Sequence, residues 1–173
     1  MSLKEVYINR AAHFFPNTPV SNDEIESYLG LVNGKPSRSR SIVLRNNGIK
    51  RRFYAIEKGG KPTHTNAQMT AEAIKNLFAG NANEIKSLQM LACGTSSPDQ
   101  MMPSHGVMVH GWLPEVGAVE VLSPSGNCCS GMHAMKFAYQ GIRTGEINTA
   151  VSTGSERLSR ILCHDVFEEE SHK

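Results

Sequence analysis

Short apolar runs alternate with amphipathic helical patterns along the middle of the chain. The runs at residues 87–92, 119–122 and 149–151 have the length of buried strands. Apolar residues recur at helical spacing after Pro103 and after Cys129. Because parallel neighbouring strands need a crossover, which a helix usually supplies, the alternation predicts an α/β fold with a mixed, mostly parallel sheet and flanking helices.

A fourth strand is expected near the N-terminus. Val6 and Ile8 lie on one face of the segment 4–11, which has the two-residue period of a half-buried strand. We therefore place four strands in one sheet, near residues 4–11, 87–93, 119–122 and 148–153.

Helix and turn signals complete the outline. Residues 21–24 and 65–68 have the capping-box spacing that marks the start of a helix. Residues 33–40 are rich in Gly, Pro, Ser and basic side chains, which predicts a loop, and residues 46–48 predict a tight turn. Gly145 is expected to end the helix that follows the apolar run at 119–122.

The composition is that of one globular domain, since 39% of the 173 residues are hydrophobic and 20% are charged. The 18 basic and 16 acidic residues give a net charge of +2, which is too even a balance for nucleic-acid binding. No stretch has the roughly 18 uncharged apolar residues of a membrane-spanning helix. We therefore expect a cytoplasmic protein with no nucleic-acid partner and no membrane partner.

The cysteines are expected to be free thiols. They have neither C-x-x-C pairing nor histidines at zinc-finger offsets, and four cysteines in a chain of this length do not make a disulfide scaffold. No metal site and no cofactor are therefore expected. The four are Cys93, Cys128, Cys129 and Cys163.

Residues 121–132 join a predicted buried strand to a predicted helix and contain two adjacent cysteines. The first N–H groups of a helix are unpaired and its dipole is positive there, so a thiolate at that place is stabilised. Ser130 and Gly131 are small, which lets a substrate carbonyl approach the sulfur. Cys128 and Cys129 compete for the role of nucleophile, and both also fit as small buried hydrophobic residues.

Short motifs follow one another along the chain in the order found in a known family. The most specific is C-(S/A)-G-(F/M) at a strand-to-helix turn with G-S-(D/E)-x-L-(S/A)-R downstream. These motifs resemble the β-ketoacyl-acyl-carrier-protein synthase III family of the thiolase-like superfamily over nearly the whole chain. The matching segments are residues 16–25, 47–52, 92–97, 102–104, 129–132 and 154–160.

The resemblance implies a condensing acyltransferase with Cys129 as its nucleophile, because the family's cysteine precedes S/A-G. An acyl thioester acylates this cysteine, and a malonyl thioester is then decarboxylated and joined to the acyl group. The implied setting is fatty-acid or related polyketide or secondary lipid synthesis. The implied partners are acyl-CoA or acyl-carrier-protein thioesters, the acyl carrier protein, and a second copy of the chain in a homodimer.

The resemblance also implies the N-terminal portion of an αβαβα fold. Residues 1–173 are expected to form a thiolase-like half-domain that ends before its last strand, because nothing after Arg160 resembles the family's Gly-Asp-Gly-Ala-Gly segment. The family's catalytic His and Asn belong to the second half of the fold, so the chain alone is expected to be inactive in condensation. His105, His110 and His133 are not assigned to that role.

Met102 and Pro103 match a position that, in the family, crosses the dimer interface and lines the partner's acyl pocket. A flexible thioether suits a pocket for an apolar chain, and it equally suits the filling of a core. Both interpretations of Met102 therefore stay open.

Basic residues near Gly48 are candidates for binding the coenzyme or carrier. Many relatives have an arginine where this chain has Asn46, so the contact is assigned to Arg45, Lys50 and Arg51. A short basic cluster is also typical of an ordinary solvated turn.

Two other function classes stay open. The chain could be a non-catalytic half-domain that acts through association, or a cysteine-dependent thioester hydrolase. The hydrolase is disfavoured, because the G-x-S-x-G elbow is not matched: the second glycine, Gly131, comes one place late.

Overall fold

A computed structural model describes residues 3–79 and 81–164. These residues form two compact units. The larger unit contains the segment up to Phe14 together with Asn66–Glu156, and the smaller unit contains Phe15–Thr65 and the segment from Arg157 onward. Each unit is described by itself.

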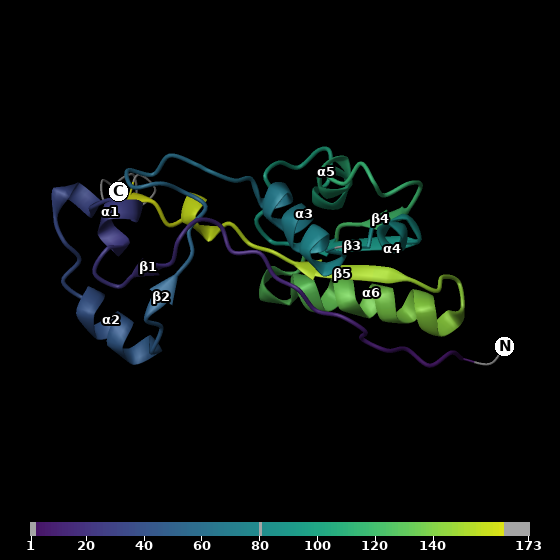
Figure 1. Cartoon of the computed structure of the whole chain (residues 1–173). Coiled ribbons are helices and arrows are strands. Elements are labelled where there is room, and N and C mark those ends of the chain that lie inside the picture. Colours follow the sequence, from purple (N-terminus) through teal and green to yellow (C-terminus); the bar gives the residue numbers. More distant parts are fainter. Residues whose placement is uncertain (1–2, 80, 165–173) are drawn as a thin grey trace. The chain divides into compact units, whose positions relative to one another are not determined.

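The larger unit is built on a three-stranded parallel sheet (Figure 1). Its strands are β3 (Met90–Gly94), β4 (Glu120–Leu122) and β5 (Ala150–Gly154), in the order β4-β3-β5. Leu91 in the central strand pairs with Val121 on one side and with Val151 on the other. The prediction of a parallel sheet from the three internal apolar runs is therefore confirmed.

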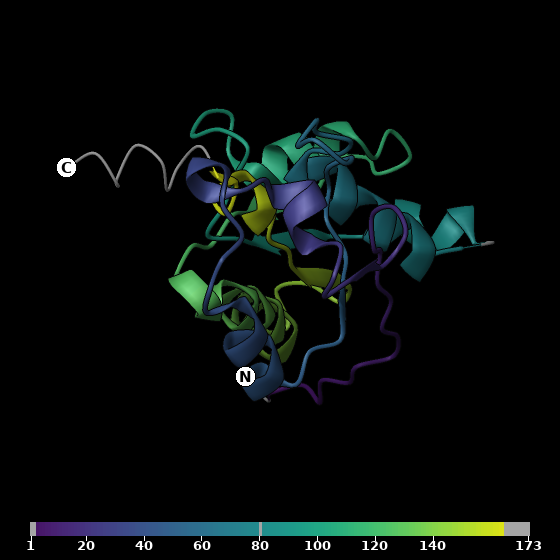
Figure 2. The ribbon, with the colours of Figure 1, turned by 90° about the vertical axis from the view of Figure 1, so that its left-hand side faces the viewer.

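Helices cover both faces of this sheet, as two views at right angles show (Figures 1 and 2). On one face lie α3 (Asn66–Leu77) and α5 (His105–Gly111), and on the other lies α6 (Ser130–Thr144). Gly145 ends α6 in the left-handed conformation, with φ of 82°, as its position in the sequence predicts.

The hydrophobic core of the larger unit divides between the two faces of the sheet. Alternate residues of β3 point to opposite faces, so Leu91 and Cys93 pack under α3 and α5, whereas Met90 packs against Ala138 of α6. The buried residues of the first face are Ala67, Ala71, Ile74, Ile85, Leu88, Leu91, Cys93, Val109, Leu113, Val116 and Val151.

Residues 4–11 form no strand, so the prediction of a fourth strand there is wrong. The Lys4 N–H donates to the Arg143 carbonyl at 2.9 Å, near the end of α6, rather than to a neighbouring strand. The alternation in this segment buries no continuous face, because Tyr7 and Ile8 remain 74% and 79% exposed. A two-residue period thus predicts a strand only where a partner strand is available.

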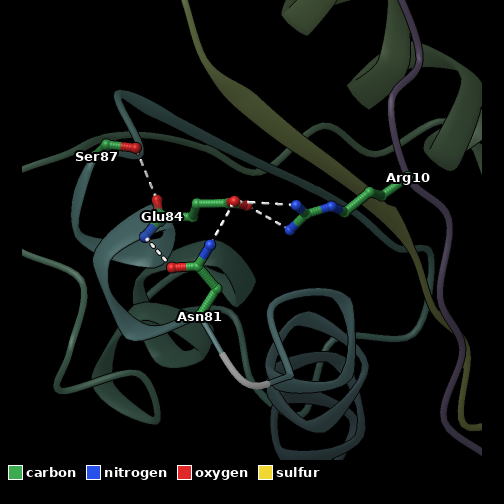
Figure 3. A network of polar contacts seen from close by, with 4 residues as sticks. All are labelled: Arg10, Asn81, Glu84 and Ser87. Atoms are coloured by element: carbon green, nitrogen blue, oxygen red, sulfur yellow. Dashed lines mark hydrogen bonds and ion pairs between the residues drawn. The ribbon is translucent and has the colours of Figure 1, made fainter.

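Arg10 attaches this extended segment to α4 (Ala82–Lys86), as Figure 3 shows. Its guanidinium donates to the Glu84 carboxylate, with one N–O distance of 3.0 Å. Asn81 caps α4 by accepting the Glu84 N–H, and its own amide donates to the Glu84 carboxylate. The carboxylate therefore links the helix cap to the N-terminal segment, and Ser87 closes the other end of the helix by donating to the Glu84 carbonyl.

The smaller unit contains a two-stranded antiparallel sheet and short helices. Strands β1 (Val20–Ser21) and β2 (Arg51–Arg52) pair, and the segment between them forms α1 (Ile25–Leu29) and α2 (Arg40–Asn47). Two short 3-10 turns complete the unit, at Val32–Gly34 and Leu158–Arg160.

The capping-box residues Ser21 and Glu24 bind each other before α1, but Glu24 rather than Ser21 is the N-cap. The Glu24 carboxylate accepts the Ser21 hydroxyl at 2.8 Å and the Ser21 N–H at 3.2 Å, and the hydroxyl bond is the main cause that lowers the Glu24 pKa. Glu24 itself is the N-cap, so the helix begins at Ile25.

The turn predicted at residues 46–48 is the end of α2, a helix that the sequence patterns did not indicate. Gly48 closes it in the left-handed conformation, with φ of 69°. No residue of this helix is buried, and Ile42 and Val43 are about half exposed, so it has no apolar stripe that a helical period would reveal.

Candidate active site

Cys129 lies at the N-terminal end of the longest helix among the described residues. Residues Asn127–Cys129 form one 3-10 turn that leads directly into α6, and Cys129 is the N-cap of that helix. Cys128 and Cys129 are both exposed, so neither is the small buried hydrophobic residue that the sequence left as an alternative. The start of a helix is a place where unpaired N–H groups and the helix dipole favour an approaching negative charge.

Glycines bring the start of α6 directly onto the carboxyl ends of two strands. A Cβ atom on Gly94, at the end of β3, would lie 2.2 Å from the Ser130 carbonyl oxygen. A Cβ on Gly131 would lie 3.2 Å from the Cα of Gly154, at the end of β5. Gly131 therefore serves close backbone packing, in addition to the substrate access for which its small size was noted.

A pair of serine hydroxyls holds the turn before Cys129. Ser130 is buried, and its hydroxyl donates to the Asn127 carbonyl at 2.7 Å and accepts the Gly126 N–H at 3.0 Å. Ser96, from the loop after β3, donates to the same Asn127 carbonyl at 2.5 Å. The turn Asn127–Cys129 is thus hydrogen-bonded to a second loop that lies far from it in sequence.

A polar network extends from this loop to the end of β5. The Glu156 carboxylate accepts the Ser96 N–H at 2.7 Å and the Ser97 hydroxyl at 2.5 Å. The fully buried Asn66 donates through its amide to Thr95 Oγ1 at 2.9 Å and to the Ser97 carbonyl at 3.0 Å. No role is predicted from the sequence for Ser96, Asn66 or Glu156, although Ser96 and Glu156 lie in the motif segments 92–97 and 154–160.

His105 is buried among hydroxyl groups on the α3 and α5 side of the sheet. Its Nε2 lies 3.2 Å from Ser155 Oγ and 3.3 Å from Thr70 Oγ1. Burial lowers the pKa of His105, which the carboxylates of Asp99 and Glu156 offset in part. Nδ1 has no hydrogen-bond partner among the described residues.

The other two histidines differ in their surroundings. His110 closes the end of α5 through Nε2, which lies 3.2 Å from the Val116 carbonyl and 3.1 Å from the Gly117 carbonyl. The exposed His133 ring packs against Gly126, just before the turn Asn127–Cys129. A Cβ atom added at Gly126 would lie only 2.6 Å from the His133 Nδ1. Of the three histidines considered, His133 is therefore the one that contacts the segment before Cys129.

The Met102 and Pro103 pair precedes α5 on the surface of the larger unit. Met102 is 86% exposed, and its neighbour Met101 is 91% exposed. Met102 therefore does not fill the core of this unit, and its place in an acyl pocket stays a prediction.

Two of the three basic candidates line a cavity in the smaller unit. A cavity of about 380 Å³ lies between α2 and the loops around it, with Arg45, Lys50, Arg40 and Asp23 in its lining. Arg40 is already paired with the Glu26 carboxylate at 2.7 Å. Arg51 belongs to β2 and is exposed outside this lining.

A second cavity of the smaller unit, of about 440 Å³, is mostly apolar and lies beside α1 and α2. Across residues 3–79 and 81–164, no cluster of His, Cys, Asp or Glu side chains is arranged to hold a metal ion. In the same ranges, no helix is long and apolar enough to cross a membrane.

Known proteins with similar sequences share one description. The chain is 28% identical over 166 residues to "Beta-ketoacyl-[acyl-carrier-protein] synthase III 1" of Deinococcus radiodurans, covering 94% of this chain and 44% of that protein. It is 26% identical over 164 residues to the synthase III of Lactobacillus helveticus, with 94% and 45% covered. The chain therefore spans less than half the length of these curated relatives. No family model matches the chain.

Solved structures agree in fold. The synthase III of Thermus thermophilus superposes with a TM-score of 0.71 at 17% identity, over 90% of this chain and 44% of that one. The tetronic acid condensing enzyme AbyA1 gives a TM-score of 0.73 at 21% identity, over 87% and 45%. These solved structures thus share the fold of this chain.

The resemblance to the β-ketoacyl-acyl-carrier-protein synthase III family is therefore confirmed by curated relatives that are 26% and 28% identical to this chain. The chain corresponds to the N-terminal portion of this thiolase-like fold, as the motifs predict. Cys129, to which the motifs assign the role of nucleophile, lies at the start of α6, and that role stays a prediction.

Proposed function

We propose that this chain is part of a condensing acyltransferase in which Cys129 accepts the acyl group of an acyl thioester. The supporting observation is the exposed Cys129 thiol at the N-terminus of α6, directly above the ends of β3 and β5. The relatives are named as synthases that act with an acyl carrier protein. The setting is fatty-acid or related polyketide or secondary lipid synthesis.

The acylation step needs no redox change and no cofactor. The Cys129 thiolate attacks the thioester carbonyl carbon, and the new C–S bond forms as the bond to the leaving sulfur breaks. The leaving thiolate, of coenzyme A or of a carrier, then takes up a proton from solvent. The positive end of α6 lies beside the oxyanion that develops as the thioester carbonyl is attacked, and it is proposed to favour that charge.

The Arg45, Lys50 and Arg51 side chains are proposed to contact the phosphates of the coenzyme or the acidic surface of the carrier. The cavity lined by Arg45 and Lys50 supports this for two of them. Met102 and Pro103 are proposed to line the acyl pocket of a partner copy in a homodimer, in keeping with the surface exposure of Met102.

Condensation is proposed to need more than acylation. Decarboxylation of a malonyl thioester develops enolate charge, which needs preorganised hydrogen-bond donors. The family resemblance assigns these donors to a His and an Asn of the second half of the fold. The 173-residue chain alone is therefore proposed to accept an acyl group without forming a β-keto product.

Mass spectrometry of the intact chain after incubation with acyl-CoA tests the proposal. An acyl adduct that maps to Cys129, that is lost in Cys129→Ala and that persists in Cys128→Ala is the expected result. An adduct that forms and is then released as free acid would favour a thioester hydrolase. The absence of any adduct would favour a non-catalytic half-domain that acts through association.

A further inference from the structure

The Asn127 carbonyl is the point where the loop after β3 meets the turn Asn127–Cys129. Ser96 and Ser130 both donate their hydroxyls to this oxygen, at 2.5 Å and 2.7 Å. The two hydroxyl oxygens lie 3.0 Å apart, and the Ser130 oxygen also accepts the Gly126 N–H. The two serines therefore hold the turn from both sides, and we call them the serine clasp.

Asn127 has a backbone conformation that benefits from such support. Its φ of 52° lies in the left-handed region, where a side chain costs energy and where asparagine is tolerated better than most residues. Its carbonyl belongs to the peptide plane that leads into Cys128 and Cys129. Two hydrogen bonds to that carbonyl fix the plane, and with it the direction in which the turn enters α6.

Glu156 places Ser96 within reach of the turn. The Ser96 side chain is exposed, so packing does not hold it, but its N–H donates to the Glu156 carboxylate at 2.7 Å. The neighbouring Ser97 hydroxyl binds the other carboxylate oxygen, and the buried Asn66 amide holds the Ser97 carbonyl. The loop after β3 is thereby anchored to the end of β5.

We infer that Ser96 and Ser130 are positioning residues for the Cys129 nucleophile, with Glu156 as the anchor of Ser96. The inference rests on the proposed function for the meaning of Cys129 as a nucleophile. The two hydroxyls act through the backbone of the turn, by fixing the position and direction of Cys129 at the start of α6.

The test compares Ser96→Ala, Ser130→Ala and the double variant with the unchanged chain. The rate of Cys129 alkylation by iodoacetamide is measured by peptide mapping, with Cys163 of the smaller unit as internal reference. Each single variant is expected to slow Cys129 about 2- to 10-fold, the range of one lost hydrogen bond. The double variant is expected to lose less than the product of the two, because both hydroxyls act on one carbonyl.

Two matched variants separate positioning from general destabilisation. Ser96→Thr keeps the hydroxyl and is expected to restore the Cys129 rate. Ser123→Ala removes a half-buried hydroxyl that binds the Gly106 N–H and Ser104 instead of the turn, and it is expected to leave the rate unchanged.

Acylation by acyl-CoA, measured on the same proteins, distinguishes this inference from the proposed function. Equal alkylation rates of Cys129 in all variants would overturn the inference that Ser96 and Ser130 position this residue, whatever the result of acylation. The opposite outcome is also possible: the alkylation rate of Cys129 depends on the two hydroxyls, but acyl-CoA does not modify the chain. This result would support the positioning role of Ser96 and Ser130 and overturn the proposed function.

Discussion

At the scale of single residues, the structure separates four cysteines of one sequence into different chemical environments. Cys93 is buried in β3, and burial raises the pKa of its thiol to about 12. Cys128 and Cys129 are exposed on one turn, and only Cys129 is the N-cap of α6. The position on the helix, rather than exposure alone, distinguishes the two neighbours.

We expect iodoacetamide near neutral pH to label Cys129 faster than Cys128, because Cys129 is the N-cap of α6 and the start of a helix favours the negatively charged nucleophile of this reaction. Peptide mapping after brief labelling measures both rates, and Cys93 serves as the unlabelled reference. Preferential labelling of Cys128, or equally slow labelling of both, would contradict the assignment of Cys129.

His105 predicts a pH dependence of stability. Because burial lowers its pKa in the folded state, the unfolded chain binds a proton first as the pH falls below the ordinary value of 6.5. The free energy of unfolding is therefore expected to decrease from about pH 7 to about pH 5.

Urea unfolding at several pH values tests the role of His105. The His105→Gln variant is expected to show a shallower decrease of the free energy of unfolding at acidic pH than the unchanged chain. His133→Gln, which removes an exposed imidazole, is the control. If the free energy of unfolding falls equally steeply with pH in His105→Gln and in the unchanged chain, the pH dependence belongs to other groups.

At the scale of elements, the site depends on how closely α6 approaches β3 and β5. The approach requires glycine at Gly94, since an added Cβ would lie 2.2 Å from the Ser130 carbonyl oxygen and the backbone of α6 would have to move. The missing side chain of Gly94 lets the start of α6 contact the sheet, and for the same reason a larger residue is not accommodated at the end of β3.

Gly94→Ala is expected to destabilise the chain by about 1–3 kcal/mol, the usual cost of overpacking, and to slow Cys129 alkylation as well. Thermal unfolding and peptide mapping measure the two effects. Gly117→Ala is the matched control, because a Cβ there has no heavy atom within 4 Å. If both variants unfold at the same temperature, the contact between β3 and α6 is looser than the structure has it.

The cavity beside α2 predicts a salt-sensitive interaction. Replacing Arg45 and Lys50 by glutamate is expected to weaken binding of a phosphate-bearing thioester or an acidic carrier at low salt, and less so at high salt. Fluorescence anisotropy with labelled acyl carrier protein measures this. Arg38→Glu together with Lys61→Glu, an equal charge change at exposed positions outside the lining, is the control, and an equal loss in both double variants would point to net charge alone.

At the scale of the whole molecule, α6 carries large apolar side chains that the described residues leave exposed. Met132, Phe137 and Tyr139 are 63%, 44% and 44% exposed. Exposed apolar side chains on one helix are typical of a surface that packs against another chain or segment. The relatives are more than twice as long as the part this chain matches.

We therefore expect the chain to self-associate at micromolar concentration, and Phe137→Glu to weaken that association. Sedimentation velocity over a concentration series measures it. Gln140→Glu, on the same helix, adds an equal charge at a polar position and is the control. A monomer at every concentration would contradict this prediction and the proposed homodimer together.

Local patterns of the sequence were sufficient for the elements that a nearby signal defines. The apolar runs became β3, β4 and β5, and the helix after Cys129 ends at Gly145 as expected, because both signals concern residues within a few positions of one another. The turn that carries Cys128 and Cys129 was located in the same way, from small residues between a strand and a helix, whereas the role of Cys129 as nucleophile stays a prediction.

Tertiary structure alone decided what depends on distant partners. Residues 4–11 alternate as a strand does, but they form none, because strand formation needs a neighbour and the Lys4 N–H binds near the end of α6 instead. Ser96 forms hydrogen bonds with Ser130, which lies 34 positions away in the sequence, and with Glu156, which lies 60 positions away. A hydroxyl or carboxylate that bonds over such a separation leaves no period in the sequence, so only the folded backbone, by bringing the ends of β3, β5 and α6 together, makes these residues part of the site.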